Sequence, residues 1–353
     1  MKQFLKIALL CFYSVSLVHA QELKTENVIL ITLDGLRWQE VFSGADPRLL
    51  WKAGAAAEEF SSESSDERRQ LLMPFFWDTV VNEGIVFGNR SVGNRVDVTN
   101  RGAFSYPGYN EILTGFADDS IDSNDKVPNK NVTVLEWVNQ QPGFIGRVAA
   151  FTSWDVFPFI INEERSGVPV NAGFEATSGQ ITDREAFLNR LQVEVATPWA
   201  WERFDVFTHY MAMEYLARKR PRLLYIGFGD TDEYAHSDDY GAYLKATRQT
   251  DDFIRDLWIW LQEDETYKGK TSLVITTDHG RGYADRWIGH GSDWVGSAFI
   301  WMAILGPDTP AGGEFTASGQ FFQNQIAATV AALLGLVYTN VRETGPPIDA
   351  AIR

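Results

Sequence analysis

The sequence predicts an α/β fold, with a mostly parallel central sheet covered by helices on both faces. Three apolar runs, at residues 27–33, 222–228 and 273–277, have the length and β-branched composition of buried strands. Each ends at an aspartate or within a few residues of one, and stretches of helical periodicity separate them. Strands that are apolar throughout are buried on both faces, which is typical of parallel sheets.

The bulk composition fits one large globular α/β domain. The chain has 353 residues, of which 45% are hydrophobic and 22% charged. Residues 1–20 combine a basic start, an apolar run at 7–18 and small residues before Gln21, which is typical of a secretory signal peptide. That run is too short to span a bilayer, so we expect an exported protein, periplasmic or extracellular, without stable membrane insertion.

Cysteine content and charge restrict the chemistry further. The only cysteine, Cys11, lies in the predicted signal peptide, so no thiolate is left to bind a metal. Removal of two lysines with that peptide leaves 29 basic against 47 acidic residues, a formal charge of −18. This charge argues against a nucleic acid duplex as partner, whereas bound dications would still allow a small anionic substrate. The sequence makes no prediction of the oligomeric state.

The elements around the three strands follow from periodicity and turn signals. Residues 46–70 are interpreted as a charged surface excursion and residues 155–197 as an irregular segment, and both are predicted to form lids on a single domain, 21–353. The remaining predicted elements are helix 71–82, strand 84–87, helix 107–113, helix 132–140, strand 147–151, helix 201–218, helix 240–263, strand 299–305 and helix 320–336.

The three aspartates that follow the strands, Asp34, Asp232 and Asp278, are expected to converge. In open α/β sheets ligands bind outside the carboxyl ends of the strands. Of the four histidines after residue 20, three lie near two of these aspartates; the fourth, His209, falls inside a predicted helix and is interpreted as structural.

The histidines near those aspartates are His236, His279 and His290. His236 follows Asp232 by four residues, a spacing that places both on one face of a helix. Carboxylates and imidazoles without sulfur suit two zinc-like dications. Such a pair, about 4 Å apart, stabilises the attacking and leaving oxygens of an in-line displacement.

A nucleophile for this displacement is available at Ser105. It precedes a helix that we expect to begin at Pro107, where free backbone N–H groups favour an anion. Metal coordination would supply the alkoxide that an unassisted serine lacks. Taken alone, a serine in this position is more often a helix cap.

The order of these residues resembles the alkaline phosphatase superfamily, nearest its nucleotide pyrophosphatase/type I phosphodiesterase branch. The resemblance spans residues 27–336 and is carried by Asp34, Ser105-Tyr106-Pro107, Thr114-Gly115, Asp232-x-x-x-His236, Asp278-His279-Gly280 and His290. It implies an alkaline phosphatase-like fold and a two-metal phosphoesterase, hydrolysing mono- or diesters through a phosphoserine. It implies zinc, with manganese as the alternative.

The resemblance also implies how the two ions are held. Asp232, His236 and His290 would bind one ion. The other would be bound by Asp34, Asp278, His279 and the Ser105 oxygen.

The predicted substrate-binding residues depart from the branch pattern. An asparagine that binds a phosphoryl oxygen usually follows the nucleophile by about twenty residues, but Lys126 stands there. We therefore expect Asn124 in that role and Lys126 as a further phosphate contact, with Arg101 and Arg281 as lesser candidates. The motif favours a diester, whereas a lysine beside the phosphate would favour a dianionic monoester.

Two related activities fit less well, and inactivity is a further alternative. Sulfatases carry an arginine where this chain has Tyr109. Phosphoglycerate mutases need a large inserted domain, for which the chain between Ser105 and Asp232 is too short. The remaining alternatives are a sulfatase or phosphonate-type hydrolase of the same superfamily, or a metal-binding inactive relative; the intact Ser105 argues against inactivity.

Overall fold

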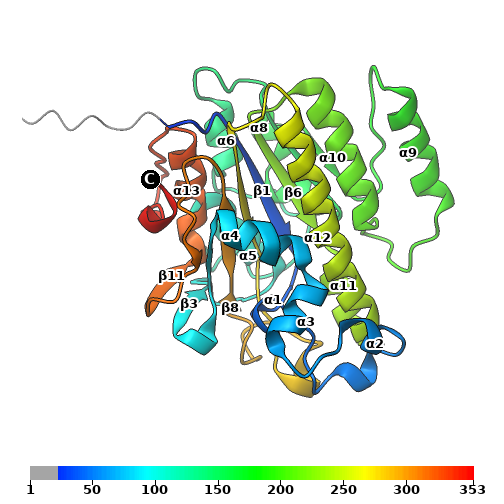
Figure 1. The fold of residues 1–353 in the computed structure, drawn as a ribbon. Coiled ribbons are helices and arrows are strands. Elements are labelled where there is room, and N and C mark those ends of the chain that lie inside the picture. Colours follow the sequence, from blue (N-terminus) through cyan, green and yellow to red (C-terminus); the bar gives the residue numbers. More distant parts are fainter. Residues whose placement is uncertain (1–22) are drawn as a thin grey trace, which may run out of the picture.

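A computed structural model describes residues 23–353 (Figure 1). The predicted signal peptide, residues 1–20, lies outside the described residues. Within the described part of the chain, no helix is long and apolar enough to cross a membrane.

An eight-stranded sheet forms the centre of the protein, as predicted. Its strand order is β10-β2-β9-β7-β1-β6-β4-β5. β1 pairs in parallel with both β6 and β7, and β9 runs antiparallel to its neighbours β7 and β2. The strands are β1 Asn27–Leu33, β2 Ile85–Phe87, β4 Val148–Thr152, β5 Val170–Ala172, β6 Leu223–Phe228, β7 Thr271–Thr276, β9 Met302–Leu305 and β10 Gly313–Glu314.

Helices cover both faces of this sheet because residues of its central strands alternate between two hydrophobic cores. Ile29, Ile31 and Leu33 of β1 belong to one core, and Val28 and Leu30 belong to the other. The first core is completed by α1 Trp38–Ser43, α2 Ala56–Phe60, α3 Ser65–Leu72, α4 Val81–Glu83, α10 Asp205–Lys219 and α12 Tyr240–Glu263. The second is completed by α5 Ser105–Thr114, α6 Val134–Asn139, α7 Phe157–Ile160 and α13 Ile326–Leu333.

A second, three-stranded sheet corrects two of the predicted elements. Its order is β11-β3-β8, with β3 Asn94–Asp97, β8 Phe299–Ile300 and β11 Gly319–Phe322. The single strand predicted over 299–305 is split between the two sheets at buried Trp301, whose indole N–H donates to the Leu36 carbonyl oxygen at 3.0 Å. The helix predicted over 320–336 begins later, at Ile326, because β11 pairs with β3 and its Phe321 packs 4.6 Å from Phe87.

The two segments predicted as lids fold against the body of the protein. In residues 46–70, Leu49, Ala53 and Phe60 are buried in the core that contains α12. Residues 155–197 contain α7, α8 Glu163–Ser166, β5 at the sheet edge and α9 Asp183–Glu194, which packs beside α10 (Figure 1). The helix predicted over 71–82 is realised as the end of α3, a π-helical turn Phe76–Val80 and α4.

Candidate active site

The register of the central strands brings the three predicted aspartates to one edge of the sheet. Leu33 of β1 lies beside Phe228 of β6, and Thr32 lies beside Thr276 of β7, so the three strands end at the same level. Asp34 directly follows β1, and Asp278 lies two residues after the end of β7. Asp232 lies in α11 Asp230–His236, which begins after β6.

The first group of side chains surrounds the Nε2 atom of His279. This nitrogen lies 3.3 Å from Asp34 Oδ1, 3.4 Å from Asp278 Oδ2 and 3.4 Å from Ser105 Oγ. The other ring nitrogen, Nδ1, lies 2.9 Å from the Gly280 carbonyl oxygen and donates to it, because a carbonyl can only accept. The Nε2 lone pair therefore faces two carboxylates and a hydroxyl, an arrangement that suits a cation between them.

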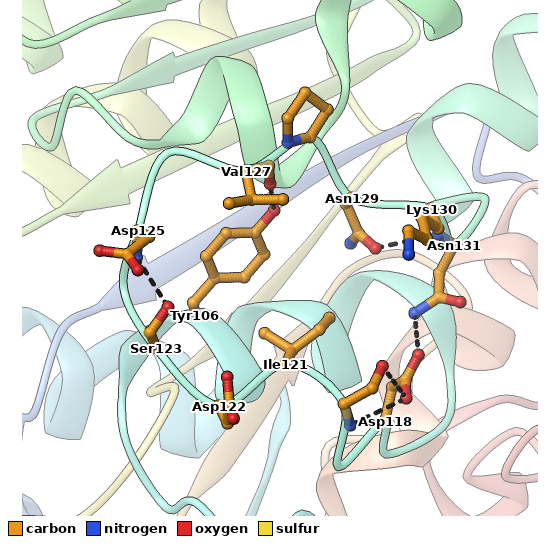
Figure 2. Close-up of a pocket in the computed structure, with 12 residues that line it drawn as sticks. Tyr106, Asp118, Ile121, Asp122, Ser123, Asp125, Val127, Asn129, Lys130 and Asn131 are labelled. Carbon is orange, nitrogen blue, oxygen red and sulfur yellow. Dashed lines mark hydrogen bonds between the residues drawn. The ribbon is translucent and has the colours of Figure 1, made fainter.

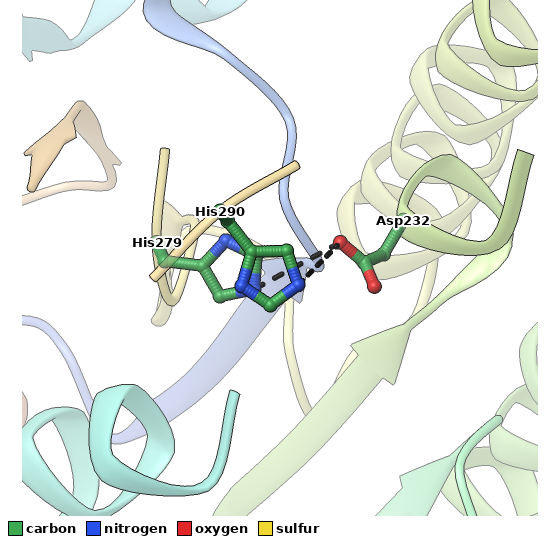
Figure 3. Close-up of side chains that lie close together, drawn as sticks. All are labelled: Asp232, His279 and His290. Carbon is green, nitrogen blue, oxygen red and sulfur yellow. Dashed lines mark ion pairs between the residues drawn. The ribbon is translucent and has the colours of Figure 1, made fainter. Parts of the chain in front are cut away.

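The second group is formed by Asp232, His236 and His290, and Figure 3 shows Asp232 and His290 beside His279 of the first group. His236 Nε2 is 3.0 Å from both Asp232 Oδ2 and His290 Nε2, and His290 Nε2 is 3.8 Å from Asp232 Oδ1. The His279 and His290 rings stack with centroids 3.9 Å apart. His279 Nε2 is also 3.8 Å from Asp232 Oδ1, so His279 stands between the two groups.

The electrostatics of both groups fit bound cations. Asp34 Oδ1, Asp278 Oδ2 and His290 Nδ1 are buried and have no hydrogen-bond partner. Burial raises the pKa of Asp34 and Asp278 well above the usual value, and the charge of a neighbouring aspartate adds to it in each case. Three carboxylates and three imidazoles supply the oxygen and nitrogen ligands that zinc prefers, and dications would remove this repulsion.

Asp232 differs from the other two aspartates because it already faces positive groups. Burial raises its pKa, but the Arg281 guanidinium and the two nearby imidazoles outweigh burial and hold the pKa well below the usual value. Arg281 is itself buried, contacts Asp232 Oδ1 closely and donates to the Trp287 carbonyl oxygen at 2.9 Å.

Ser105 is the first residue of α5 and is 95% buried against this site. Helix α5 can approach because residue 108 is glycine: a Cβ there would lie 2.4 Å from the Asp278 carbonyl oxygen. Gln323 Nε2 donates to that same carbonyl at 2.6 Å. The backbone bearing Asp278 is thus fixed against the helix that bears Ser105.

The predicted substrate-binding residues fall into two sets. Asn124 and Lys126 line an open pocket of about 480 Å³ that also contains Ser105. Asn124 Oδ1 accepts from the Tyr106 N–H at 3.0 Å, which places its amide beside the start of α5. Arg101 and Arg281 do not line this pocket.

The two arginines instead contact aspartates of the protein. Arg101 is exposed and pairs with Asp119 at 3.1 Å, whereas Arg281 is held against Asp232. Lys126, although in the pocket, pairs with Asp155 at 2.6 Å.

The loop that carries Asn124 and Lys126 is fixed from its other side. That side forms a separate pocket of about 320 Å³, lined by Tyr106 and residues of the loop itself (Figure 2). The Tyr106 hydroxyl donates to the Val127 carbonyl oxygen at 2.6 Å, and Asn131 Nδ2 donates to Asp118 Oδ2 at 2.8 Å.

Several residues in or beside the pocket that contains Ser105 were not predicted. Tyr109, one helical turn after Ser105, donates its hydroxyl to Asp34 Oδ2 at 2.8 Å, and its spacing from Ser105 was the available signal. The outer wall consists of residues from three segments of the chain, and no sequence pattern links them: Trp154, Asp155, Val156, Trp201, Glu202 and Glu233.

His209, interpreted from the sequence as structural, lies away from this site. It is 98% buried in α10 and stacks on Phe253 with ring centroids 4.5 Å apart. Burial lowers its pKa to about 4, so the ring is neutral at physiological pH.

Comparison with known proteins supplies a family and a fold. Residues 53–308 match the family described as type I phosphodiesterase / nucleotide pyrophosphatase. No curated protein matches the chain. Many solved structures share the fold, among them three whose identities are too low to carry an activity across.

The first is the wild-type alkaline phosphatase PafA (TM-score 0.60, 12% identity, 94% of this chain and 99% of that chain). The second is the phosphonate monoester hydrolase of Agrobacterium radiobacter (TM-score 0.58, 15% identity, 92% of this chain and 76% of that chain). The third is BT1596, a 2-O GAG sulfatase (TM-score 0.56, 13% identity, 92% of this chain and 73% of that chain). These likenesses confirm the predicted alkaline phosphatase-like fold.

Proposed function

The chain belongs to the type I phosphodiesterase / nucleotide pyrophosphatase family, within the alkaline phosphatase superfamily, and on that premise we propose that it is a two-metal phosphodiesterase. The observation that carries the proposal is the position of Ser105. Its hydroxyl lies 3.4 Å from His279 Nε2, beside the unpartnered oxygens of Asp34 and Asp278 and at the start of α5.

Two dications, zinc or alternatively manganese, would be held by the two groups of side chains. Asp34, Asp278, His279 and Ser105 would hold one ion, and Asp232, His236 and His290 the other. When bound, the ions supply positive charge that lowers the pKa of the serine hydroxyl and stabilises the charge of the leaving group.

The chain's own residues then perform a double displacement. The Ser105 hydroxyl gives its proton to water as Oγ attacks phosphorus, the bond to the first alcohol breaks, and the departing alkoxide takes a proton from water. Water next attacks the phosphoserine, and cleavage of the bond from phosphorus to Oγ releases a phosphate monoester and restores Ser105. The free N–H groups at the start of α5 and the amide of Asn124 would orient the phosphoryl oxygens, as phosphoryl transfer depends mainly on positioning and charge.

The charge of the pocket favours a diester over a monoester. Lys126 is its single lysine, and Asp155 neutralises it at 2.6 Å. A second full negative charge on a monoester would therefore meet the nearby carboxyl groups of Glu202 and Glu233, and beyond the two ions no free basic side chain of the pocket lining would offset it. Arg281, held on Asp232, would position that ligand instead of binding substrate.

The test compares wild type with Ser105→Ala for metal content and for turnover of three aryl esters: bis(4-nitrophenyl) phosphate, 4-nitrophenyl phosphate and 4-nitrophenyl sulfate. We expect two ions in the wild-type protein, turnover of the diester above both others, and a loss of at least about 10³-fold in Ser105→Ala. Ser123→Ala, on the nearby loop, is the matched control and should keep wild-type turnover. Two bound ions without turnover of any ester would refute the proposal, and dominant sulfate hydrolysis would replace the substrate class.

We also propose that the protein is exported and works as one catalytic domain, residues 21–353. The support is the basic, then apolar, then small-residue pattern of residues 1–20. Intact-mass measurement of the protein secreted by its host would show a mature chain that begins at Gln21; a chain that retains Met1 would contradict export by cleavage.

A further inference from the structure

One wall of the active-site pocket is built by an antiparallel pairing outside the central sheet. Trp154 and Glu202 form a β-bridge, the Asp155 N–H donates to the Trp201 carbonyl oxygen at 3.0 Å, and residues 153 and 203 continue the pairing. The side chains of Trp154, Asp155, Trp201 and Glu202 line the pocket. The pairing thus holds two indole rings and two carboxyl groups together beside the proposed metal site.

The pocket lining beyond the proposed metal ligands is strongly acidic. It carries four carboxyl groups, of Asp125, Asp155, Glu202 and Glu233, against the single ammonium group of Lys126. Because Lys126 pairs with Asp155 at 2.6 Å, three carboxyl groups remain without a basic partner in the lining. Such a lining repels anions and attracts cations.

Glu202 is the buried member of this acidic lining. It is 95% buried, and its Oε1 atom has no hydrogen-bond partner. Gly229 leaves room for this oxygen, since a Cβ at that position would lie 1.7 Å from it. A buried carboxylate needs a hydrogen bond or a counter-charge, and the pocket is the side from which a ligand can supply one.

Two other buried carboxylates close to Glu202 are already satisfied by the protein. Asp205 accepts from the Ser153 hydroxyl at 2.6 Å and from the Gly229 N–H at 2.7 Å. Asp230 accepts from the Asp205 N–H at 3.2 Å. The three carboxyl groups lie close enough together to share a cation, but Glu202 is the only one of the three with a buried oxygen that lacks a hydrogen-bond partner.

The indole rings supply the second feature that suits a cation. Trp201 is 49% exposed, and its indole N–H donates to Glu233 Oε1 at 2.6 Å, which fixes the ring beside two carboxyl groups. Trp154 is held by aromatic neighbours, with Phe157 at 6.2 Å between ring centroids. Ring faces and carboxylates together bind substituted ammonium groups.

We propose that this wall, formed by Trp154, Trp201, Glu202 and Glu233, binds a positively charged amine carried by one of the two alcohols of the phosphodiester substrate. The inference rests on the proposed phosphodiesterase activity and adds the chemical class of the substituent. An uncharged substituent would leave Glu202 unpaired, and an anionic one would be repelled.

The test uses two substrates of the same shape that differ by one charge. These are 4-nitrophenyl phosphocholine and its uncharged isostere, 4-nitrophenyl 3,3-dimethylbutyl phosphate; 4-nitrophenyl phosphoethanolamine distinguishes a primary from a quaternary amine. The quantity measured is the ratio of kcat/KM for the cationic substrate to kcat/KM for the uncharged one. We expect a ratio of about 10 to 100 in wild type, from one desolvated ion pair with aromatic contact.

Glu202→Gln and Trp201→Leu are expected to reduce this ratio to within about threefold of unity. Glu83→Gln, which removes the same charge at an exposed position in α4, is the matched control and should keep the wild-type ratio. Thermal unfolding of each variant establishes that it is folded, and Glu233→Gln replaces any variant that is not.

The outcomes separate the two proposals. Turnover of neither diester would refute the phosphodiesterase function itself. Equal turnover of both diesters by wild type would refute only the amine site. A preference for the cation that persists in Glu202→Gln and Trp201→Leu would also refute it, as would stabilisation of wild type but not Glu202→Gln by Ca²⁺ without any cation preference.

Discussion

Replacing Tyr109 by phenylalanine removes one hydroxyl from the site and leaves the ring in place. The ring is 99% buried and packs 4.6 Å from Phe157, between centroids, so the substitution creates almost no cavity. The hydroxyl donates to Asp34 Oδ2 at 2.8 Å, and this bond lowers the pKa of a carboxyl group that burial raises. Without it, Asp34 is more readily protonated and its orientation is free to change.

The expected magnitude follows from the charge of the acceptor. A buried hydrogen bond to a carboxylate contributes about 1.5–3 kcal/mol, and each 1.4 kcal/mol corresponds to about a factor of ten. We therefore expect Tyr109→Phe to weaken binding of the ion held by Asp34 by about 10- to 100-fold, the range typical for partners of metal ligands.

The assay is competition for zinc with a chelator of known affinity, followed by diester hydrolysis at limiting and at saturating zinc. Activity should fall at limiting zinc and recover largely when zinc is saturating. Tyr225→Phe is the matched control: its buried hydroxyl contacts Thr32 Oγ1 at 2.6 Å and no proposed metal ligand, so its zinc affinity should equal that of wild type. Equal zinc affinity of Tyr109→Phe and wild type would refute the reasoning.

Three further predictions concern single residues. His290→Ala should bind one ion in place of two, measured by elemental analysis, because His290 lies 3.0 Å from His236 in the second group; retention of two ions would contradict the assignment. Gly108→Ala should lower both activity and stability, by about 1–3 kcal/mol in denaturant unfolding, since its Cβ would overlap the Asp278 carbonyl; wild-type stability would show that α5 can shift freely. The pKa of His209 is lowered from 6.5 in the unfolded chain to about 4 in the folded protein. Between pH 6.5 and pH 4 the unfolded chain therefore binds more protons than the folded protein, and the free energy of unfolding falls as the pH falls. His209→Phe should reduce that loss by up to about 3 kcal/mol, as seen in unfolding curves at pH 4 and pH 7, and an unchanged pH profile would contradict it.

Much of the fold follows from local patterns. Strands β1, β6 and β7 are mostly apolar without polar alternation, a pattern that predicts burial on both faces and hence a parallel sheet, and every residue of the three strands is buried. The predictions failed where packing against a distant segment decided the outcome. Phe321 extends as a strand because β3 and Phe87 lie beside it, although the sequence around it continues the apolar pattern of α13.

The candidate site also contains residues that local patterns predicted and residues whose contacts only packing decided. Asp34, Asp232 and Asp278 were predicted to converge because the carboxyl ends of neighbouring parallel strands meet at one edge. Arg281 was predicted near substrate from its position after His279, whereas the structure holds its guanidinium on Asp232, inside the protein. A side chain that long reaches several neighbours, and its direction depends on packing that a sequence does not contain.

The sequence by itself thus determined the fold class, the order of the site residues and their meeting at one sheet edge, because strand periodicity and strand ends are local properties. Tertiary structure alone decided what surrounds them. Glu202 reaches the pocket because residues 153–155 pair with residues 201–203 across almost fifty positions of chain. That pairing, and the unpartnered carboxyl group it buries, arises from contacts between segments with no shared pattern, and it is the feature from which we infer the substituent of the substrate.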